Sequence, residues 1–192
     1  HKPIPPFSPV RLPLFILPET VQERLPNMPK LVTVTVEGVA DRGMSLARME
    51  GKVLFLPFGA PGDEVEAVVR KERKGYANGE IRRVLVPSPH RREPRCPHFG
   101  VCGGCAWQHL DYEAQVAGKA TAFQGLLRTR LGPDAVRFRD PLPSPREYGY
   151  RTRATFQVTR SETPAPGYFR GASHERIPIT ACPICHPKLE AL

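Results

Sequence analysis

Three cysteines within ten residues constrain this chain more than any other feature. Cys96, Cys102 and Cys105 are separated by five residues and then by two. Glycines fill the second gap, so the backbone can fold tightly there and turn both sulfurs inward. Thiolates are soft ligands that select zinc, cuprous copper or iron–sulfur clusters. A fourth ligand can come from Cys182, because iron–sulfur sites often combine a compact run with one remote cysteine.

The spacing of the cysteines leaves the identity of the metal open. Structural zinc sites commonly use paired cysteines two to four residues apart, and Cys182 and Cys185 form such a pair. The first gap of five residues fits that pattern less well. Zinc and iron–sulfur therefore both stand as alternatives, and either Cys182 or Cys185 can be the fourth ligand. All five cysteines fall in these two groups, which indicates a metal site in a reducing cytoplasm rather than a secreted disulfide scaffold.

Charge predicts the kind of partner. The chain carries 28 Lys and Arg against 19 Asp and Glu, a formal net charge of +9. Such a balance favours a polyanion, and nucleic acid is the commonest one. No apolar run approaches the length of a membrane span, roughly 18 residues, so no membrane partner is expected. The sequence holds no Ser/His/Asp set, paired carboxylates or glycine-rich phosphate loop, and we assign no catalytic residue to it.

The first half of the chain predicts a small barrel. Residues 1–29 hold eight of the 23 prolines and are expected to form a disordered arm. From residue 30 the pattern changes to short strands with alternating apolar residues and frequent turns, which is typical of a five-stranded barrel of the oligonucleotide-binding (OB) type over residues 30–88. The strands are expected at 31–36, 44–49, 53–56, 65–69 and 80–86.

The second half, residues 89–192, predicts an α+β domain that contains the cysteines. Asp111 is a plausible N-cap, and apolar residues then recur at steps of three and four as far as Leu131, which predicts an amphipathic helix over 111–131. Strands are expected at 150–159, 167–170 and 176–179, and the last of these leads directly to Cys182. The fold class is thus a mixture of β and α+β.

Basic residues near the loops of the barrel predict the surface that meets nucleic acid. They can track phosphates, and an aromatic ring among them can stack on a base. For any one of these basic residues taken alone, the simpler interpretation is that it belongs to a solvent-exposed charged edge. As a group, and next to Arg91 and Arg95, they favour contact with RNA; the residues expected to bind it are Lys71, Arg73, Lys74, Tyr76, Arg82, Arg92 and Arg153.

Several motifs together resemble a known family. The run Cys96-x5-Cys-Gly-Gly-Cys105-x2-Gln108 resembles the S-adenosylmethionine-dependent RNA uracil-5-methyltransferases, in particular the branch that acts on 23S ribosomal RNA. The barrel looks like a TRAM domain. Further similarity to the family lies in Glu37-Gly-Val-Ala-Asp-Arg-Gly43, Gly51-Lys-Val-Leu-Phe-Leu56, Lys74-Gly-Tyr76, Tyr150-Arg-Thr-Arg153 and Gly167-Tyr-Phe-Arg170.

The resemblance implies a [4Fe–4S] cluster held by four cysteines: Cys96, Cys102, Cys105 and Cys182. It also implies ribosomal RNA as partner, a cytoplasmic location and no stable protein partner. Catalysis and S-adenosylmethionine binding would reside in a separate C-terminal Rossmann-like domain that is absent from this chain, so the chain alone is expected to be inactive. The alternatives are a stand-alone RNA-binding module with zinc or a cluster, a redox sensor, or a family member that modifies transfer RNA.

Overall fold

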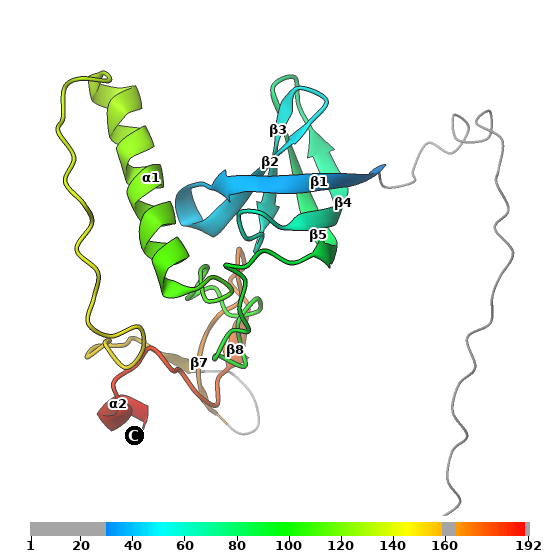
Figure 1. The fold of residues 1–192 in the computed structure, drawn as a ribbon. Helices are drawn as coiled ribbons and strands as arrows, with labels where there is room; N and C mark the ends of the chain where they lie inside the picture. Colours follow the sequence, from blue (N-terminus) through cyan, green and yellow to red (C-terminus); the bar gives the residue numbers. More distant parts are fainter. Residues whose placement is uncertain (1–29, 159–163, 191–192) are drawn as a thin grey trace, which may run out of the picture.

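Five strands close into a small barrel, as the alternating pattern predicted. The computed structural model describes residues 30–158 and 164–190; the predicted N-terminal arm lies outside them. Neighbouring strands follow the order β1-β2-β3-β5-β4 around the closed barrel (Figure 1). The strands are β1 (Lys30–Val39), β2 (Met44–Met49), β3 (Lys52–Pro57), β4 (Glu64–Glu72) and β5 (Tyr76–Val86).

The core of the barrel follows from the alternation of apolar and polar residues along each strand. Val34 and Val36 are buried on β1, while the neighbouring Thr33 and Thr35 are exposed. Successive side chains of a strand point to opposite faces, so alternation places one set inside the barrel. The other strands contribute in the same way, and the buried core consists of Val34, Val36, Ala47, Met49, Leu54, Leu56, Val65, Ala67 and Ala77.

The turn between β4 and β5 is shorter than the sequence suggested. Lys71 pairs with Asn78 and Glu72 with Ala77, so the ladder continues to the end of β4. The backbone N–H of Arg73 then donates to the Tyr76 carbonyl at 2.8 Å and closes the hairpin. Lys71 and Tyr76, which were expected in a basic loop, therefore belong to strands.

Helix α1 (Tyr112–Leu131) begins where the capping signal placed it. Asp111 is the N-cap, and its Oδ1 accepts a hydrogen bond of 2.7 Å from the Ala114 backbone. The predicted apolar face is only partly covered by the described residues: Val116, Ala120 and Leu127 are half-buried, whereas Phe123 is 58% and Leu131 57% exposed. None of the helices within the described ranges is long and apolar enough to cross a bilayer.

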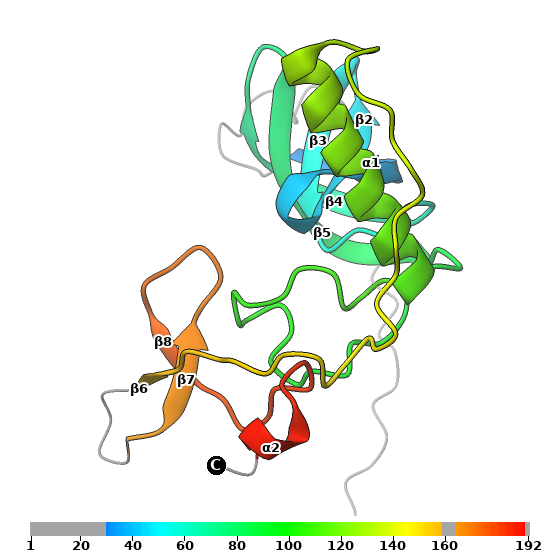
Figure 2. The ribbon, with the colours of Figure 1, turned by 90° about the vertical axis from the view of Figure 1, so that its left-hand side faces the viewer.

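A second small core joins the barrel to α1. Val39, Ala60 and Leu110 are buried together, with Trp107 and Ala114 packed against them. The one buried residue of α1 is Gly118; a Cβ there would lie 2.4 Å from Val39 Cγ2, so only glycine lets the helix approach this closely. A 3-10 turn, η2 (Asp41–Gly43), also contacts α1. The helix stands beside the barrel in Figure 1 and crosses in front of it in the view of Figure 2.

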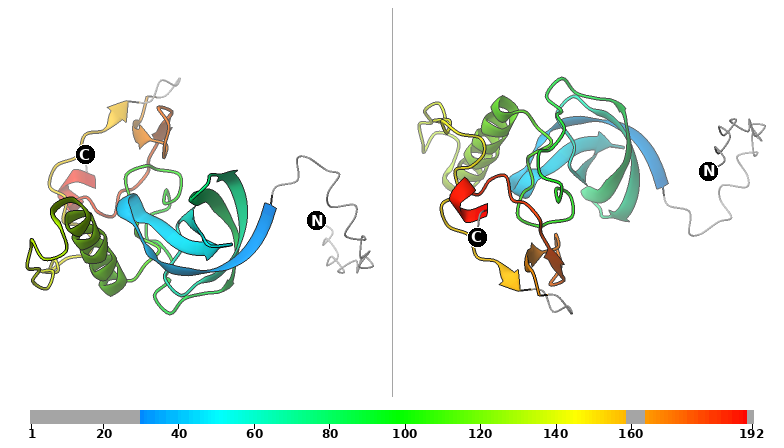
Figure 3. Two further views of the ribbon diagram at one scale, coloured as in Figure 1. Left: turned by 90° about the horizontal axis from the view of Figure 1, so that it is seen from above. Right: turned by 90° about the horizontal axis from the view of Figure 1, so that it is seen from below.

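The C-terminal part forms a small three-stranded sheet in the order β6-β7-β8. Its strands are β6 (Gln157–Val158), β7 (Pro166–Phe169) and β8 (Arg176–Pro178), and a short helix, α2 (Pro187–Glu190), follows. Seen from above and below, α1 and this sheet lie on the side of the barrel away from the start of β1 (Figure 3).

The strand predicted over residues 150–159 was wrong for most of its length. Only Gln157–Val158 pairs with β7, and residue 159 lies outside the described ranges. Arg151 instead bonds to the loop before α2: its N–H donates to the Ile184 carbonyl, and its own carbonyl accepts from the His186 N–H. A strand extends only where a partner strand exists, and β7 offers four residues.

Candidate functional site

Four cysteines from two distant segments line one small cavity. Cys96, Cys102 and Cys105 come from the loop before α1, and Cys182 follows β8. The structure thus brings together the four residues that were expected to act as ligands. Arg151 and Gln108 also line this cavity. The sequence suggested Arg151 only as part of a second basic patch and gave Gln108 no role, although both fall inside the quoted motifs.

Backbone hydrogen bonds join the cysteine loop to the end of β7 and the turn that follows it. The Gly103 N–H donates to the Phe169 carbonyl at 2.9 Å, and the Gly171 N–H donates to the Val101 carbonyl at 3.0 Å. Gly103 is needed for this approach, because a Cβ would lie 3.2 Å from the Cα of Gly171.

A histidine of the cysteine loop makes a further link. His98 Nε2 accepts a hydrogen bond of 2.9 Å from the backbone N–H of Thr180, two residues before Cys182. This bond holds the segment that carries the remote cysteine against the loop that carries the other three.

Cys185 differs from the other cysteines in its position. It is buried but does not line the cavity. Burial, with the nearby Cys182, raises the pKa of its thiol to about 11. Its backbone N–H donates to the Cys182 carbonyl at 2.8 Å, which closes the turn that presents Cys182. Of the two candidates for the fourth position, Cys182 therefore has the better placement.

Hydrogen-bond donors approach three of the cavity sulfurs. The Gly104 N–H lies 3.4 Å from Cys102 Sγ. Burial raises the pKa of Cys96 and Cys105, whereas the backbone N–H of His98 and the amide of Gln108 act in the opposite direction on these two thiols. A buried thiol stays protonated until a metal replaces the proton, and such donors then stabilise the thiolate.

Gln108 connects two of these cysteines. Its side chain is 6% exposed, and its Oε1 accepts a hydrogen bond of 3.2 Å from the Cys96 backbone. Its Nε2 is buried and has no hydrogen-bond partner among the described residues. The amide lies near the Cys105 thiol and partly offsets the rise in pKa that burial causes there. The side chain thus spans the two ends of the cysteine loop.

The donor set fits a sulfur-ligated group. Within residues 30–158 and 164–190, no three His, Cys, Asp or Glu side chains converge closely enough to hold a single metal ion. The four thiols line a common cavity. An iron–sulfur cluster takes cysteine thiolates on its separate iron atoms, so an all-sulfur set arranged around a volume suits it chemically.

The basic residues predicted to bind RNA divide into separate groups. Lys71, Arg73, Lys74 and Tyr76 lie on the exposed β4–β5 hairpin. The three cations make no ion pair with any other described residue. Figure 1 places this hairpin at the end of the barrel remote from the segment around the cysteines. Arg82, farther along β5, lies 3.7 Å from Glu66.

The cations near the cysteine loop have other surroundings. Arg91 contacts the buried Asp63 and does not face solvent as a free cation. Arg92 is half-buried and forms an ion pair of 2.9 Å with Glu147. Arg153 is exposed and beyond the barrel. The predicted residues therefore do not form one continuous groove with Arg91 and Arg95.

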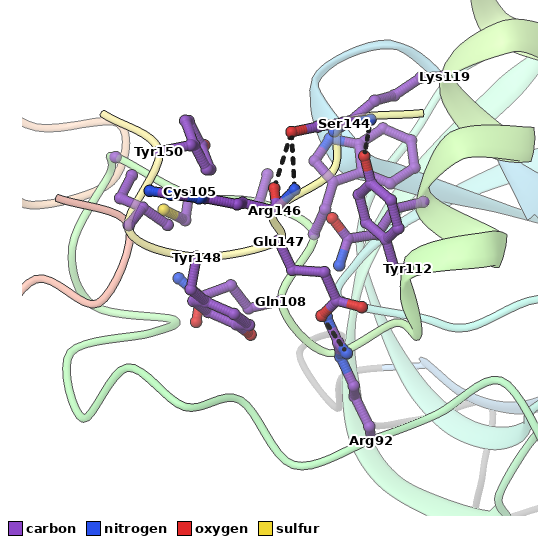
Figure 4. A pocket seen from close by; sticks show the side chains of 15 residues that line it. Arg92, Cys105, Gln108, Tyr112, Lys119, Ser144, Arg146, Glu147, Tyr148 and Tyr150 are labelled. Carbon is purple, nitrogen blue, oxygen red and sulfur yellow. Dashed lines mark hydrogen bonds and ion pairs between the residues drawn. The ribbon is translucent and has the colours of Figure 1, made fainter. Parts of the chain in front are cut away.

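A larger pocket beside the cysteine loop was not foreseen from the sequence. It has a volume of about 370 Å³ and lies between this loop, the start of α1 and the segment 144–150 (Figure 4). Trp107, Tyr112, Tyr148 and Tyr150 contribute rings to it. The run Tyr148-Gly-Tyr150 beside several arginines was the available signal, but its neighbours come from three separated segments.

Comparison with known proteins matches the barrel and most of the chain. Residues 30–82 match the TRAM domain. A 23S rRNA (uracil(1939)-C(5))-methyltransferase, RlmD, of Edwardsiella ictaluri is 35% identical over 166 residues, which cover 85% of this chain and 37% of that protein. An uncharacterised RNA methyltransferase of Synechocystis is 35% identical over 164 residues, which cover 84% of this chain and 35% of that protein.

A solved structure shares the fold. The tRNA (uracil-54, C5)-methyltransferase of Pyrococcus abyssi, in complex with S-adenosyl-L-homocysteine, superposes with a TM-score of 0.50 at 24% identity. The match covers 82% of this chain and 34% of that one. The chain thus spans about a third of the length of the relatives that it matches.

Proposed function

We propose that this chain, which belongs to the family of TRAM-domain RNA (uracil-C5)-methyltransferases, binds ribosomal RNA for the S-adenosylmethionine-dependent formation of 5-methyluridine in 23S rRNA. The observation that carries the proposal is the combination of an RNA-type barrel with four cysteines around one adjoining cavity. Relatives named as RNA methyltransferases align with most of this chain.

The described residues contribute RNA binding to this activity. The unpaired cations of the β4–β5 hairpin are free to neutralise phosphates, and the exposed ring of Tyr76 can stack on a base. We assign the same role to Arg82, Arg92 and Arg153. Methyl transfer and the binding of S-adenosylmethionine are proposed for the enzyme as a whole, in the cytoplasm.

The cavity is proposed to hold a [4Fe–4S] cluster on Cys96, Cys102, Cys105 and Cys182. When bound, the cluster would cross-link the loop before α1 to the segment after β8. The residues around it then orient the ligands: Gly104, Gln108 and the backbone of His98 supply N–H groups to the sulfurs. This organisation supports an architectural role, in which the cluster orders a face that meets RNA.

Two measurements on anaerobically purified protein test this proposal. Iron and sulfide analysis is expected to give about four of each per chain, with the broad visible absorption of a cluster. RNA binding, followed by fluorescence anisotropy at several salt concentrations, is expected to weaken steeply with salt. Stoichiometric zinc in a colourless sample would contradict the cluster and favour a zinc-binding RNA module; binding that ignores salt would contradict the phosphate contacts.

A further inference from the structure

The pocket beside α1 has the composition of a nucleotide site. Its volume of about 370 Å³ falls at the lower end of the range for small-ligand sites. Its walls come from the cysteine loop, the first two turns of α1 and the segment 144–150, as Figure 4 shows.

Aromatic rings line the pocket, and a cation lies over two of them. The Arg95 guanidinium lies 4.6 Å from the centre of the Tyr148 ring, and the Lys119 ammonium lies 5.9 Å from that of Trp107. The hydroxyl of Tyr112 accepts a hydrogen bond of 2.6 Å from the Ser144 backbone, which holds its ring against the facing segment. Rings and guanidinium planes are the surfaces on which unstacked RNA bases are held.

The pocket carries an excess of positive charge. Its cations are Arg92, Lys119 and Arg146, and its one acidic residue is Glu147, which pairs with Arg92 at 2.9 Å. Lys119 and Arg146 make no ion pair with the residues that the structure describes. Two cations therefore remain available for a phosphate next to the aromatic walls.

A buried donor beside the pocket lacks an acceptor. Arg92 Nε is buried and has no hydrogen-bond partner within the described ranges, although its Nη1 contacts Glu147. Leaving such a donor unsatisfied costs about 1–3 kcal/mol, more for a charged group. A ligand that brings oxygen acceptors, such as a base carbonyl or a phosphate, would satisfy it.

We infer that this pocket holds one unstacked nucleotide of single-stranded RNA, its base against the rings and its phosphate near Lys119 and Arg146. The inference rests on the proposed function and adds a second contact point, separate from the barrel hairpin. Because Cys105 and Gln108 line both this pocket and the cysteine cavity, the same loop forms a wall of each. Order in the cysteine site therefore sets the shape of the nucleotide site.

Photo-cross-linking tests the assignment on the purified cluster-containing protein. The probe is a single-stranded RNA of about ten nucleotides that carries 4-thiouridine, and cross-linked peptides are mapped by mass spectrometry. Cross-links are expected within residues 104–108 or 144–150. Cross-links confined to the barrel would overturn the pocket assignment.

Anisotropy measurements with the same RNA separate the two proposals. Tyr148→Leu is expected to weaken RNA binding roughly tenfold, because one stacked base is lost. Lys119→Gln removes an exposed cation proposed to contact the phosphate and leaves the half-buried Tyr148 ring in place. Phe123→Leu, on α1 but outside the pocket, is the matched control and should bind as the parent does. If both pocket variants bind RNA normally, the pocket is not the site. If the parent protein binds no RNA, the proposed function fails, and this inference fails with it.

Discussion

The Asp63 carboxylate is fully buried and receives the Arg91 guanidinium, whose Nε lies 3.0 Å and 3.1 Å from its two oxygens. The Ser88 and Ala60 N–H groups donate to the same carboxylate at 2.8 and 2.7 Å. Arg91 also donates to the Phe58 carbonyl at 2.8 Å. Asp63 directly precedes β4, whereas Arg91 follows β5. The pair therefore anchors the segment that runs from the end of the barrel to the cysteine loop.

Removing the carboxylate charge is expected to destabilise the protein. Asp63→Asn leaves the half-buried Arg91 without its anion, and breaking such a pair costs about 3–5 kcal/mol. Urea unfolding measures the loss in the free energy of unfolding. Glu66→Gln is the control, since its ion pairs with the exposed Arg82 and Arg83 are worth at most about 1 kcal/mol. Equal losses in the two variants would contradict the assignment.

Acid is expected to lower the stability in two stages. Burial holds the pKa of His109 below its ordinary 6.5, so the unfolded chain takes up this proton first, and stability falls as the pH drops below that value. Burial raises the pKa of Asp63, but hydrogen bonds from Arg91, Ser88 and Ala60 outweigh it and leave the net pKa below 3.8. The stability that Asp63 contributes is therefore complete above that value and is lost as the pH falls through its folded pKa.

Thermal unfolding between neutral pH and pH 3 checks both stages. His109→Gln is expected to reduce the fall in Tm that begins near pH 6.5. Asp63→Asn is expected to reduce the fall that begins below about pH 4, to which the Asp111 carboxyl, whose pKa is also lowered, contributes as well. A parent Tm that is constant between pH 7 and pH 5 would show that His109 titrates alike in the folded and unfolded chains.

Two glycines of α1 are expected to respond oppositely to alanine. At Gly118 a Cβ would lie 2.4 Å from Val39 Cγ2 and 2.8 Å from Trp107 Cζ3, and overpacking of this kind costs about 1–3 kcal/mol. At Gly125 nothing lies within 4 Å, so alanine gains its helix propensity, up to about 1 kcal/mol. Thermal unfolding of the two variants measures both signs. A stabilised Gly118→Ala would mean that α1 does not pack on the barrel.

The two C-terminal cysteines are expected to differ in their effect on the metal. Cys182→Ser removes a thiol from the cavity and should lower the iron content of the purified protein strongly. Cys185→Ser changes a buried thiol outside the cavity lining and should leave iron near the parent value. Iron analysis and the visible spectrum measure both. The reverse pattern would make Cys185 the fourth ligand.

The barrel hairpin is expected to set much of the salt dependence of RNA binding. Replacing Lys71, Arg73 and Lys74 by Gln removes three unpaired cations, so the slope of log K against log salt should become shallower by about 2. Arg70→Gln is the control, because that cation is paired with Glu80 at 2.8 Å. An unchanged slope in the triple variant would place the phosphate contacts elsewhere.

The sequence by itself determined the features that depend on near neighbours. Alternation in the run around Val34 and Val36 predicted a strand with one buried face, and Asp111 marked the start of α1 through a hydrogen bond to a residue three positions on. The cysteine motif predicted a sulfur-ligated site from the types of ligand alone; the structure brings the four thiols to one cavity, and the ligated group stays a prediction. Such signals lie within one strand or one helical turn, where geometry is fixed by the backbone itself.

Only the tertiary structure decided which distant segments meet. The 150–159 region was read as a strand from its own residues, yet its pairing depends on the four-residue β7. The apolar positions of α1 suggested a face that packs on other residues, while the residue of α1 that is buried is Gly118, which carries no hydrophobic signal. The pocket beside the cysteine loop likewise needs Trp107, Lys119 and Tyr148 from three segments. Their meeting depends on hydrogen bonds and packing between residues far apart in the chain, which local periodicity does not encode.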